Sequence, residues 1–434
     1  MPSTSRGYRA AVRLGVMVAP AFGLLNPKLR AGLKARREAG DRLLDWARWN
    51  RDPSRPLVWF HAASVGEGRQ AESVLQALRR RRPDCQIVYT HFSPSAEALA
   101  SAIGADAADY LPFDLPANVD RLLQVVQPNL LIFAKLDVWA ELATRAATSG
   151  VEVALVAATV GPGSSRLRWP ARQLLRPGYR AIAAAAAVAP ADAARLERLG
   201  VERERIQVLG DPRFDSVVER VARVRPDDPL LRLGAGAPTL VAGSTWAADE
   251  RVVLQAFAAL LRSRADARLL LVPHEPGTGH LGRLEDTARG FHLPRPMRLS
   301  SMEGPGSLVV VDRLGILSTL YGTGTMAYVG GGFGRAGLHS VLEPAAWRIP
   351  VVFGPAWRNS RDAELLLQAR AAVALPRSGP AEALEQQWAD WLRDEDGRAA
   401  QGRRAREVVE QGLGAADRSA ELLARFISAR RPRR

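Results

Sequence analysis

The stretch VWFHAASVGEGRQAESVLQALRR, residues 58–80, carries one complete strand–loop–helix unit. Its first residues form an apolar run, and the loop that follows consists of glycine and small residues. The helix then places four apolar residues on one face: Ala71, Val74, Leu75 and Leu78. A phosphate-binding P-loop would end in Gly-Lys-Ser/Thr, whereas this loop offers Glu67. The stretch predicts an α/β unit whose loop presents a carboxylate.

Short apolar runs alternate with amphipathic stretches along most of the chain. The first series of predicted strands comprises Leu57–His61, Ile87–Thr90, Leu130–Phe133, Val153–Val156, Ala181–Ala187 and Ile206–Leu209. The second series comprises Thr239–Ala242, Arg268–Val272, Leu308–Val311, Ala327–Val329 and Val351–Phe353. Continuous apolar strands separated by helices indicate parallel sheets covered on both faces. We therefore predict an α/β protein of two doubly wound, Rossmann-like halves that face each other across a cleft.

The 434 residues exceed what one ordinary core accommodates, so we expect two domains. We assign residues 1–40 to an N-terminal segment and residues 41–215 to the first Rossmann-like domain. Residues 216–237 contain two prolines and no strand pattern, which indicates a linker. Residues 238–434 form the second domain, whose charged helical C-terminal region ends in the solvated tail ISARRPRR.

The charge balance favours an anionic partner. The formal net charge is +15, and nearly all of the positive charge is arginine, since Lys28, Lys34 and Lys135 are the only lysines. This excess predicts attraction to nucleic acid, an anionic membrane or a phosphorylated substrate. The single cysteine, Cys85, excludes an intramolecular disulfide and a cysteine-based metal site. The six histidines are scattered, which argues against a zinc enzyme.

The N-terminal segment is basic and weakly apolar. Its apolar stretch, Leu14–Leu25, is shorter than the roughly 20 residues that a bilayer core requires. Basic residues flank it on both sides, with Arg13 before it and Lys28 and Arg30 after it. A segment that lies in the lipid headgroup region satisfies both clusters. The alternative is an ordinary first helix packed on the domain.

A glycine-rich loop in the second half gives the densest signal for a ligand site. In TMAYVGGGFGRAGLHSVLEPAAW, residues 325–347, a strand runs into Gly330, Gly331 and Gly332, and Gly334 and Gly337 follow. Glycines let the backbone approach a phosphate, and the stretch HSVLEPAAW reads as a helix whose N-terminus favours anions. His339 and Ser340 begin that helix, and Glu343 lies one turn later, placed to accept hydrogen bonds from ribose hydroxyls. The alternative is a tight strand–helix turn with a solvated glutamate.

Three other groups follow predicted strands. Ser244 and Thr245 either cap a helix or hold phosphate. Lys135 and Asp137 end a fully apolar strand, where they form a local ion pair or face the cleft. Arg213 follows a strand near the domain boundary, where it is either a surface residue or a partner for a leaving phosphate.

Glu67 follows the carboxyl end of a parallel strand, which is where ligands bind in such sheets. A carboxylate near a helix N-terminus is held ionised and can take a proton from an incoming hydroxyl. The alternative is a glutamate in the first helical turn that is merely stabilised by the helix dipole. Geometry favours the base.

Six motifs occur in order between about residue 57 and residue 375: WFHAASVGE, YLPFD, LGDPRFD, GSTWAADE, DRLGILSTLYGTGTMAYVGGGF and GLHSVLEPAAWRIPVVFGP. Together they resemble the 3-deoxy-D-manno-octulosonic acid (Kdo) transferases of lipopolysaccharide synthesis. The resemblance implies an inverting GT-B glycosyltransferase that uses CMP-Kdo and a lipid A precursor, with no metal or other cofactor. It also implies that the N-terminal segment associates with the cytoplasmic face of the inner membrane, an anionic surface.

The resemblance assigns roles by position. Glu67 matches the catalytic base, and the acceptor side comprises Ser64, Gly66, Lys135 and Asp137. Arg213 stands where the family usually has a lysine near the donor phosphate. His339, Ser340 and Glu343 match the nucleotide-binding His-Asn-x-x-Glu, with serine replacing asparagine. The donor side also comprises Ser244, Thr245, His274, Gly331, Gly332 and Gly337.

Two motifs depart from the family pattern. The usual Glu-Thr-Glu-Leu-Trp-Pro appears as Lys-Leu-Asp-Val-Trp-Ala at residues 135–140, which reverses a charge on the acceptor side. The usual Pro-Arg-His-Pro appears as Pro-His-Glu-Pro at residues 273–276, which removes an arginine from the donor side. The two rival hypotheses are another GT-B enzyme that uses a UDP-sugar, as a transferase or an epimerase, and a non-catalytic protein that binds anions or membranes. The sequence contains no recognisable nucleic-acid-binding motif, so we do not expect nucleic acid as the partner.

Overall fold

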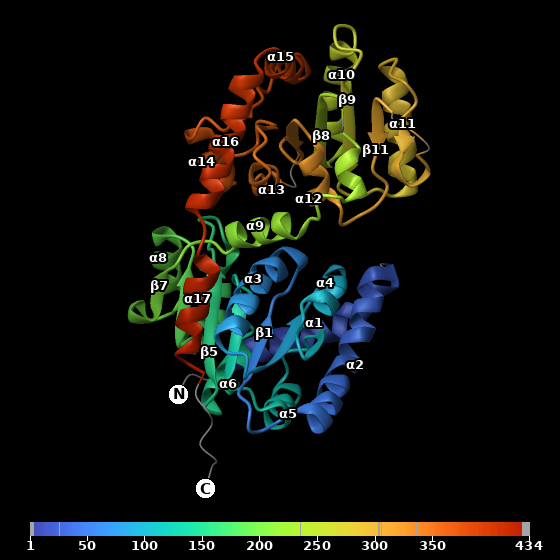
Figure 1. Ribbon diagram of the computed structural model, residues 1–434. Coiled ribbons are helices and arrows are strands. Elements are labelled where there is room, and N and C mark those ends of the chain that lie inside the picture. The colour runs from blue at the N-terminus through green and yellow to red at the C-terminus, as the bar shows by residue number, and fades with distance from the viewer. Residues whose placement is uncertain are drawn as a thin grey trace. The chain divides into compact units, whose positions relative to one another are not determined.

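The computed structural model describes residues 4–25, 27–234, 236–302, 304, 306–334 and 337–427, and the side chains of residues 23–29 lie outside this description (Figure 1). The chain divides into two compact units. The first comprises Met1–Ser216 and Leu413–Arg434, and the second comprises Val217–Gly412.

In the first unit, the described residues form a parallel sheet of seven strands in the order β3-β2-β1-β4-β5-β6-β7. The strands are β1 Leu57–His61, β2 Gln86–His91, β3 Ala107–Tyr110, β4 Leu130–Ala134, β5 Glu152–Ala158, β6 Ala184–Ala187 and β7 Ile206–Val208. The helices are α1 Arg6–Leu25, α2 Pro27–Asn50, α3 Val65–Arg81, α4 Glu97–Ala102, α5 Pro116–Val126, α6 Ala140–Thr148, α7 Ala171–Arg180, α8 Pro190–Leu199 and α17 Ala415–Ala424.

The central strands of this sheet are buried on both faces, as predicted. Trp59 and Phe133 contribute to the hydrophobic cluster on one face, and Phe60 and Ile132 contribute to the cluster on the other. The strand order reverses between β1 and β4, which pair directly. The loops that follow these two strands therefore open at the topological switch point, where α/β sheets bind ligands.

One strand of this sheet does not appear among the predicted strands. Strand β3 lies at the edge of the sheet, and two of its four residues are only half-buried and one is exposed. An edge strand needs no continuous apolar run, so its sequence, AADY, gives little signal. Strand β6 begins at Ala184 and not at Ala181, because Ala181 caps the end of α7.

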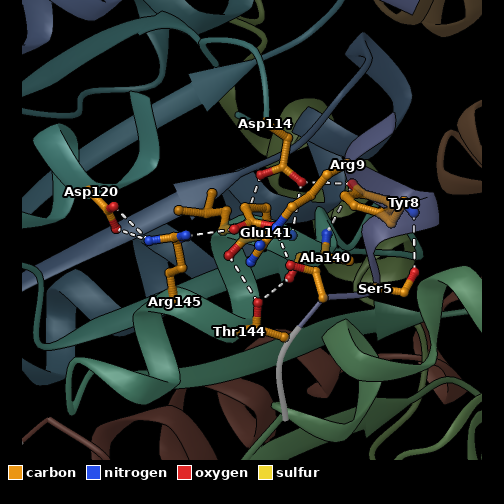
Figure 2. Close-up of polar contacts among 11 residues, drawn as sticks. Ser5, Tyr8, Arg9, Asp114, Asp120, Ala140, Glu141, Thr144 and Arg145 are labelled. Carbon is orange, nitrogen blue, oxygen red and sulfur yellow. Dashed lines mark hydrogen bonds and ion pairs between the residues drawn. The ribbon is translucent and has the colours of Figure 1, made fainter. Parts of the chain in front are cut away.

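Buried polar side chains attach the start of α1 to α6 (Figure 2). The hydroxyl of Tyr8 donates to Oδ2 of Asp114 at 2.6 Å, and Nε of Arg9 donates to Glu141 at 2.9 Å. The carboxylate of Asp114 also accepts hydrogen bonds from the backbone nitrogens of Glu141 and Leu142, at 2.9 and 2.8 Å, and so satisfies the first turn of α6. The first turn of α1 is thus packed on the domain, as the alternative hypothesis for this segment expected.

Farther along α1, large apolar side chains are exposed: Leu14, Met17 and Phe22. None of the helices in the described part of the chain is long and apolar enough to cross a membrane. Placement of this segment in the headgroup region stays a prediction.

In the second unit, the described residues form a parallel sheet of seven strands in the order β10-β11-β9-β8-β12-β13-β14. The strands are β8 Thr239–Thr245, β9 Arg268–Pro273, β10 Met297–Arg298, β11 Leu308–Val310, β12 Met326–Val329, β13 Val351–Phe353 and β14 Ala372–Ala374. The helices are α10 Ala247–Leu260, α11 Thr278–Gly290, α12 Leu317–Leu320, α13 Leu342–Ala346, α14 Arg361–Gln368, α15 Pro380–Arg393 and α16 Glu395–Gln411.

The switch point of the second sheet lies between β8 and β12. Ser244 lies at the carboxyl end of β8 and Gly330 directly follows β12, so both predicted donor motifs meet at this edge of the sheet. The two short strands at the edges of this sheet, β10 and β14, were not predicted, since an edge position requires no continuous apolar run.

The structure divides the chain differently from the predicted linker and second domain. Residues 216–237 are not a bare connection, because helix α9 covers Arg213–Arg223 and a 3₁₀ turn covers Pro229–Arg232. The amphipathic sequence RFDSVVERVAR explains the helix, and Pro226 lies beyond its end.

Helix α17 returns to the first unit, although the sequence analysis placed it in the second domain. Ala420 and Leu423 join the cluster that also contains Val74 of α3, and Figure 1 shows α17 beside that sheet. Asp215 accepts hydrogen bonds from two backbone nitrogens at the start of α17. Of the predicted tail, residues 428–434 lie outside the described residues.

Candidate active site

Glu67 lies in the first turn of α3, just after β1. Ser64 caps this helix, and its hydroxyl accepts a hydrogen bond from the backbone nitrogen of Glu67 at 3.4 Å. The side chain of Glu67 is 17% exposed, and its Oε2 atom is buried without a hydrogen-bond partner among the described residues. A Cβ placed on Gly66 meets nothing within 4 Å, so the backbone beside Glu67 borders open space.

Lys135 directly follows β4 and faces Glu67. The distance from Nζ of Lys135 to Oε1 of Glu67 is 3.9 Å. Lys135 has a φ of +63°, an unfavourable conformation for a non-glycine residue, and its backbone nitrogen donates to the carbonyl of Val156 at 2.8 Å. The tertiary structure therefore holds the turn in a strained conformation that brings an ammonium to the carboxylate.

Asp137, the other predicted residue of this loop, pairs with a residue that the sequence analysis missed. Its Oδ1 atom lies 3.0 Å from Nη2 of Arg166. Burial raises the pKa of Asp137, and the charge of Arg166 opposes that rise. The interpretation of Lys135 and Asp137 as one local ion pair is wrong, since each has a different partner.

Tyr89 was also missed, because it reads as an ordinary strand residue. Its hydroxyl is buried without a hydrogen-bond partner among the described residues, and a Cβ on Gly68 would lie 2.8 Å from it. Burial raises the pKa of Tyr89, and the charge of Glu67 raises it further. Two neighbouring polar atoms, Oε2 of Glu67 and the hydroxyl of Tyr89, thus lack partners at the switch point. Buried groups of this kind require an explanation, and a bound hydroxyl or water would satisfy them.

In the second unit, the glycines after β12 allow close packing of backbone segments. A Cβ on Gly331 would lie 2.1 Å from the carbonyl oxygen of Gly337, and one on Gly332 would lie 2.6 Å from the nitrogen of Gly354. Gly331 and Gly337 have φ values of +94° and +86°, which favour glycine. These glycines are needed by the fold itself, in addition to any approach of a phosphate.

The helix after this loop is shorter than predicted. Helix α13 begins at Leu342, with Val341 as its N-cap, so His339 and Ser340 precede it. Ser340 is exposed. Glu343 does lie in the helix, but its Oε1 accepts a hydrogen bond from Arg220 of α9 at 2.8 Å. The prediction that the helix begins at His339 and Ser340 is therefore wrong, and their role in binding the donor stays a prediction.

Asp249, which the sequence analysis did not single out, organises this region. Its carboxylate accepts hydrogen bonds from the Tyr328 hydroxyl at 2.7 Å and from the backbone nitrogens of Gly331 and Trp246, both at 3.0 Å. Burial raises the pKa of Asp249, and these hydrogen bonds lower it. The signal was an acidic residue three positions after the start of a helix, as in a capping box.

Neither Ser244 nor Thr245 caps helix α10, because the N-cap is Trp246. Ser244 has a φ of +53°, and the hydroxyl of Thr245 donates to Glu250 at 3.1 Å. The capping hypothesis for this pair is wrong, and the phosphate hypothesis stays a prediction.

Three aromatic rings stack at the switch point of the second unit. His339 stacks on His274, with ring centroids 4.4 Å apart, and on Trp246, while Trp246 and His274 are tilted against each other at 4.8 Å. Nε1 of Trp246 donates to Nε2 of His339 at 3.0 Å. Burial lowers the pKa of His339 to about 4, so the ring is neutral at pH 7 and carries its proton on Nδ1. The structure thus brings two predicted donor residues, His274 and His339, together.

Arg213 begins α9, and its guanidinium forms hydrogen bonds to Asp211 at 2.9 and 2.7 Å. The described residues contain no group of three or more histidine, cysteine, aspartate or glutamate side chains placed to hold a metal ion.

A sequence profile described as "3-Deoxy-D-manno-octulosonic-acid transferase (kdotransferase)" matches residues 36–216. The 3-deoxy-D-manno-octulosonic acid transferase of Bordetella pertussis is 30% identical over 79% of this chain and 81% of its own. The chain belongs to the Kdo transferase family. As a member of this family it is a glycosyltransferase, and the resemblance found in its motifs is confirmed.

Solved structures confirm the GT-B fold of this Kdo transferase. A glycosyltransferase from Rickettsia africae aligns with a TM-score of 0.58 at 13% identity, over 86% of this chain and 98% of its own. The UDP-GlcNAc 2-epimerase of Neisseria meningitidis aligns with a TM-score of 0.59 at 10% identity, over 86% of this chain and 99% of its own. Transferases and epimerases thus share this fold, and the reaction must be argued from the site.

Proposed function

We propose that this protein transfers Kdo from CMP-Kdo to a hydroxyl of a phosphorylated glycolipid, a lipid A precursor, with inversion at the anomeric carbon. The names of its relatives support Kdo as the sugar that is transferred, and the family motifs support CMP-Kdo as the donor. The reaction would take place at the cytoplasmic face of the inner membrane, toward which the basic N-terminal segment would be attracted.

One observation carries the proposal: Oε2 of Glu67 is buried at the switch point with no hydrogen-bond partner among the described residues, while Oε1 lies beside Lys135. Oε2 takes the proton of the acceptor hydroxyl while the oxygen of that hydroxyl forms a bond to the anomeric carbon of Kdo. The bond between that carbon and the phosphate oxygen of CMP-Kdo breaks, and CMP leaves with the electron pair. Lys135, whose Nζ lies 3.9 Å from Oε1, would fix the orientation of Glu67 during the transfer.

The donor fits the second unit. The flat faces of Trp246, His274 and His339 suit a nucleobase, since aromatic rings stack on any base. The backbone around Gly331 suits the phosphate, because glycine permits close approach. On the family pattern, we assign Glu343 to the binding of the ribose and Arg213 to the binding of the departing phosphate. Glu343 at present accepts a hydrogen bond from Arg220, and Arg213 donates one to Asp211.

The test is direct. Full-length protein is incubated with CMP-Kdo and a lipid A precursor, and the product is weighed by mass spectrometry. We expect a mass increase that corresponds to added Kdo, and CMP, but not UDP, should protect the protein from thermal unfolding.

A Glu67→Gln variant, which keeps the shape of the side chain, should lose about 10²- to 10⁴-fold in kcat while it still binds CMP. Near-normal turnover by this variant would remove Glu67 from the mechanism. Protection by UDP in place of CMP would point to the UDP-sugar alternative.

A further inference from the structure

An apolar cavity of about 540 Å³ lies between α1, α2 and the loop after β2. Its wall is largely hydrophobic, and the residues that form it include Val12, Gly15, Val16, Leu33, Phe92 and Trp139. This volume lies within the range of cavities that hold ligands, and such cavities are commonly apolar with a few polar groups.

Arg36 is the charged residue in that wall, and it is unusually buried for an arginine. Only 6% of it is exposed, and its guanidinium lies 3.4 Å over the ring of Phe92. Nη2 donates to the carbonyl of Phe92 at 2.7 Å, while Nε has no hydrogen-bond partner in the described part of the chain. Among the described residues, no carboxylate forms an ion pair with Arg36. A buried cation without a counter-ion is costly, and an anionic ligand would remove that cost.

Arg36 also borders a second, more polar cavity of about 230 Å³. The residues that line this cavity include Arg37, Asn118 and Arg121. Asp41 also lines the second cavity and pairs with Arg121 at 3.0 Å, so the guanidinium of Arg36 lies between an apolar compartment and a charged, polar one. An amphiphile with an acyl chain and a phosphate group matches the two compartments.

The exposed apolar side chains on the outer surface of α1 favour a lipid as the ligand of the cavity. Leu14 and Met17 are 59% and 70% exposed on the same helix that contributes Val12 and Val16 to the cavity wall. An exposed apolar patch next to basic residues is typical of proteins that contact lipid.

Hydrogen bonds join the cavity wall to the loop that carries Glu67. Trp139 stacks on Phe92 with ring centroids 5.3 Å apart, and its Nε1 donates to His61 of β1 at 3.1 Å. The backbone nitrogens of Phe92 and Ser93 donate to the carbonyl of Ala63, at 3.2 and 2.7 Å. The wall of the cavity is therefore in direct contact with the loop that carries the candidate base.

We propose that the cavity between α1 and α2 holds an acyl chain of the glycolipid acceptor and that Arg36 pairs with a phosphate of the same molecule. This inference rests on the proposed function, because that function supplies the acylated, phosphorylated acceptor.

The test fills the cavity. Gly15 lines the cavity and a Cβ there meets nothing within 4 Å, so Gly15→Phe should direct a ring toward the cavity, and it removes a helix-weakening glycine. Gly282→Phe in α11 is the matched control, since a Cβ there also meets nothing within 4 Å. Binding of radiolabelled lipid A precursor, and of the same phosphorylated sugar without its acyl chains, is measured on the full-length protein in the absence of donor.

We expect Gly15→Phe to weaken binding of the acylated acceptor roughly 50-fold, which corresponds to displacement of about three methylenes. Binding of the deacylated sugar should not change, and Gly282→Phe should alter neither. Arg36→Met should weaken both ligands, because both carry phosphate, and Arg36→Lys should restore most of the loss.

Equal affinity of Gly15→Phe and the unmodified protein for the acylated acceptor would overturn the proposal. So would a defect of Gly15→Phe confined to adsorption on phosphatidylglycerol vesicles, which would assign the cavity to bulk phospholipid. The binding assay contains no donor, so its result does not depend on whether Kdo is transferred. If the incubation with CMP-Kdo gave no Kdo product while the acceptor bound as expected, the proposed function would be refuted and this inference would stand.

Discussion

The buried carboxylate of Asp114 should make the first unit less stable as the pH rises through about 6. Burial raises the pKa of Asp114 from 3.8 to about 6, against the hydrogen bonds from Tyr8, Glu141 and Leu142 that favour its ionised form. Asp114 joins α1 to α6 (Figure 2), so its ionisation bears on the helix that forms the wall of the proposed acyl-chain cavity.

The magnitude follows from the shift. Because the folded protein holds the proton more tightly than the unfolded chain, the contribution of Asp114 is fully present below about pH 4 and is lost as the pH rises through about 6. A shift of this size corresponds to about 3 kcal/mol of unfolding free energy.

The assay compares the unmodified protein with Asp114→Asn. Urea unfolding is followed from pH 4 to pH 8 through hydrogen exchange of β1 and β4 amides. An asparagine has one acceptor oxygen, so the variant loses a hydrogen bond at a cost of about 1–3 kcal/mol that does not vary with pH. Between pH 4 and pH 8, the difference in unfolding free energy between the two proteins should shift by about 2.4 kcal/mol in favour of the variant, because the unfolded chain is already partly ionised at pH 4.

Asp120→Asn is the control, because Asp120 is 46% exposed where it pairs with Arg145 of the same cluster. Its difference from the unmodified protein should vary by less than about 1 kcal/mol. A difference for Asp114→Asn that stays flat from pH 4 to pH 8 would refute the reasoning.

Two further predictions concern the two switch points. Glu67→Gln and Lys135→Met should show a coupling of about 1 kcal/mol in a double-mutant cycle of unfolding free energies, since the 3.9 Å pair is partly screened by solvent; additive effects would show that the pair does not interact. Gly331→Ala should destabilise the second unit by more than about 3 kcal/mol, because its Cβ would overlap the carbonyl of Gly337 at a positive φ. Gly337→Ala, which meets no atom within 4 Å, should cost only about 1–2 kcal/mol, and equal losses in thermal melts would contradict the packing argument.

Local patterns in the chain were sufficient for most of the architecture. The central strands β1, β4, β8 and β9 were predicted because each is a continuous apolar run, which is what burial on both faces requires. The edge strands β3, β10 and β14 were missed, because an edge position places no such demand on composition.

The sites were predictable only in part. Glu67 and the glycine loop could be recognised in the sequence, because each places an unusual residue type directly after a predicted strand. Asp249 and Tyr89 do not, because an acidic residue in a first helical turn and a tyrosine in a strand are common. Their roles depend on contacts with residues elsewhere in the sequence: Asp249 accepts a hydrogen bond from Gly331, and the hydroxyl of Tyr89 lies close to Gly68.

The sequence by itself determined two Rossmann-like series, a carboxylate after the first strand, a glycine turn in the second half and membership of the Kdo transferase family. Only the tertiary structure decided that Lys135 faces Glu67, that Trp246, His274 and His339 stack, and that α17 returns to the first unit. The physical reason is that periodicity is a property of neighbouring residues and is visible in any short window. Partners across a sheet depend on strand order, which the free energy of the whole packed unit selects.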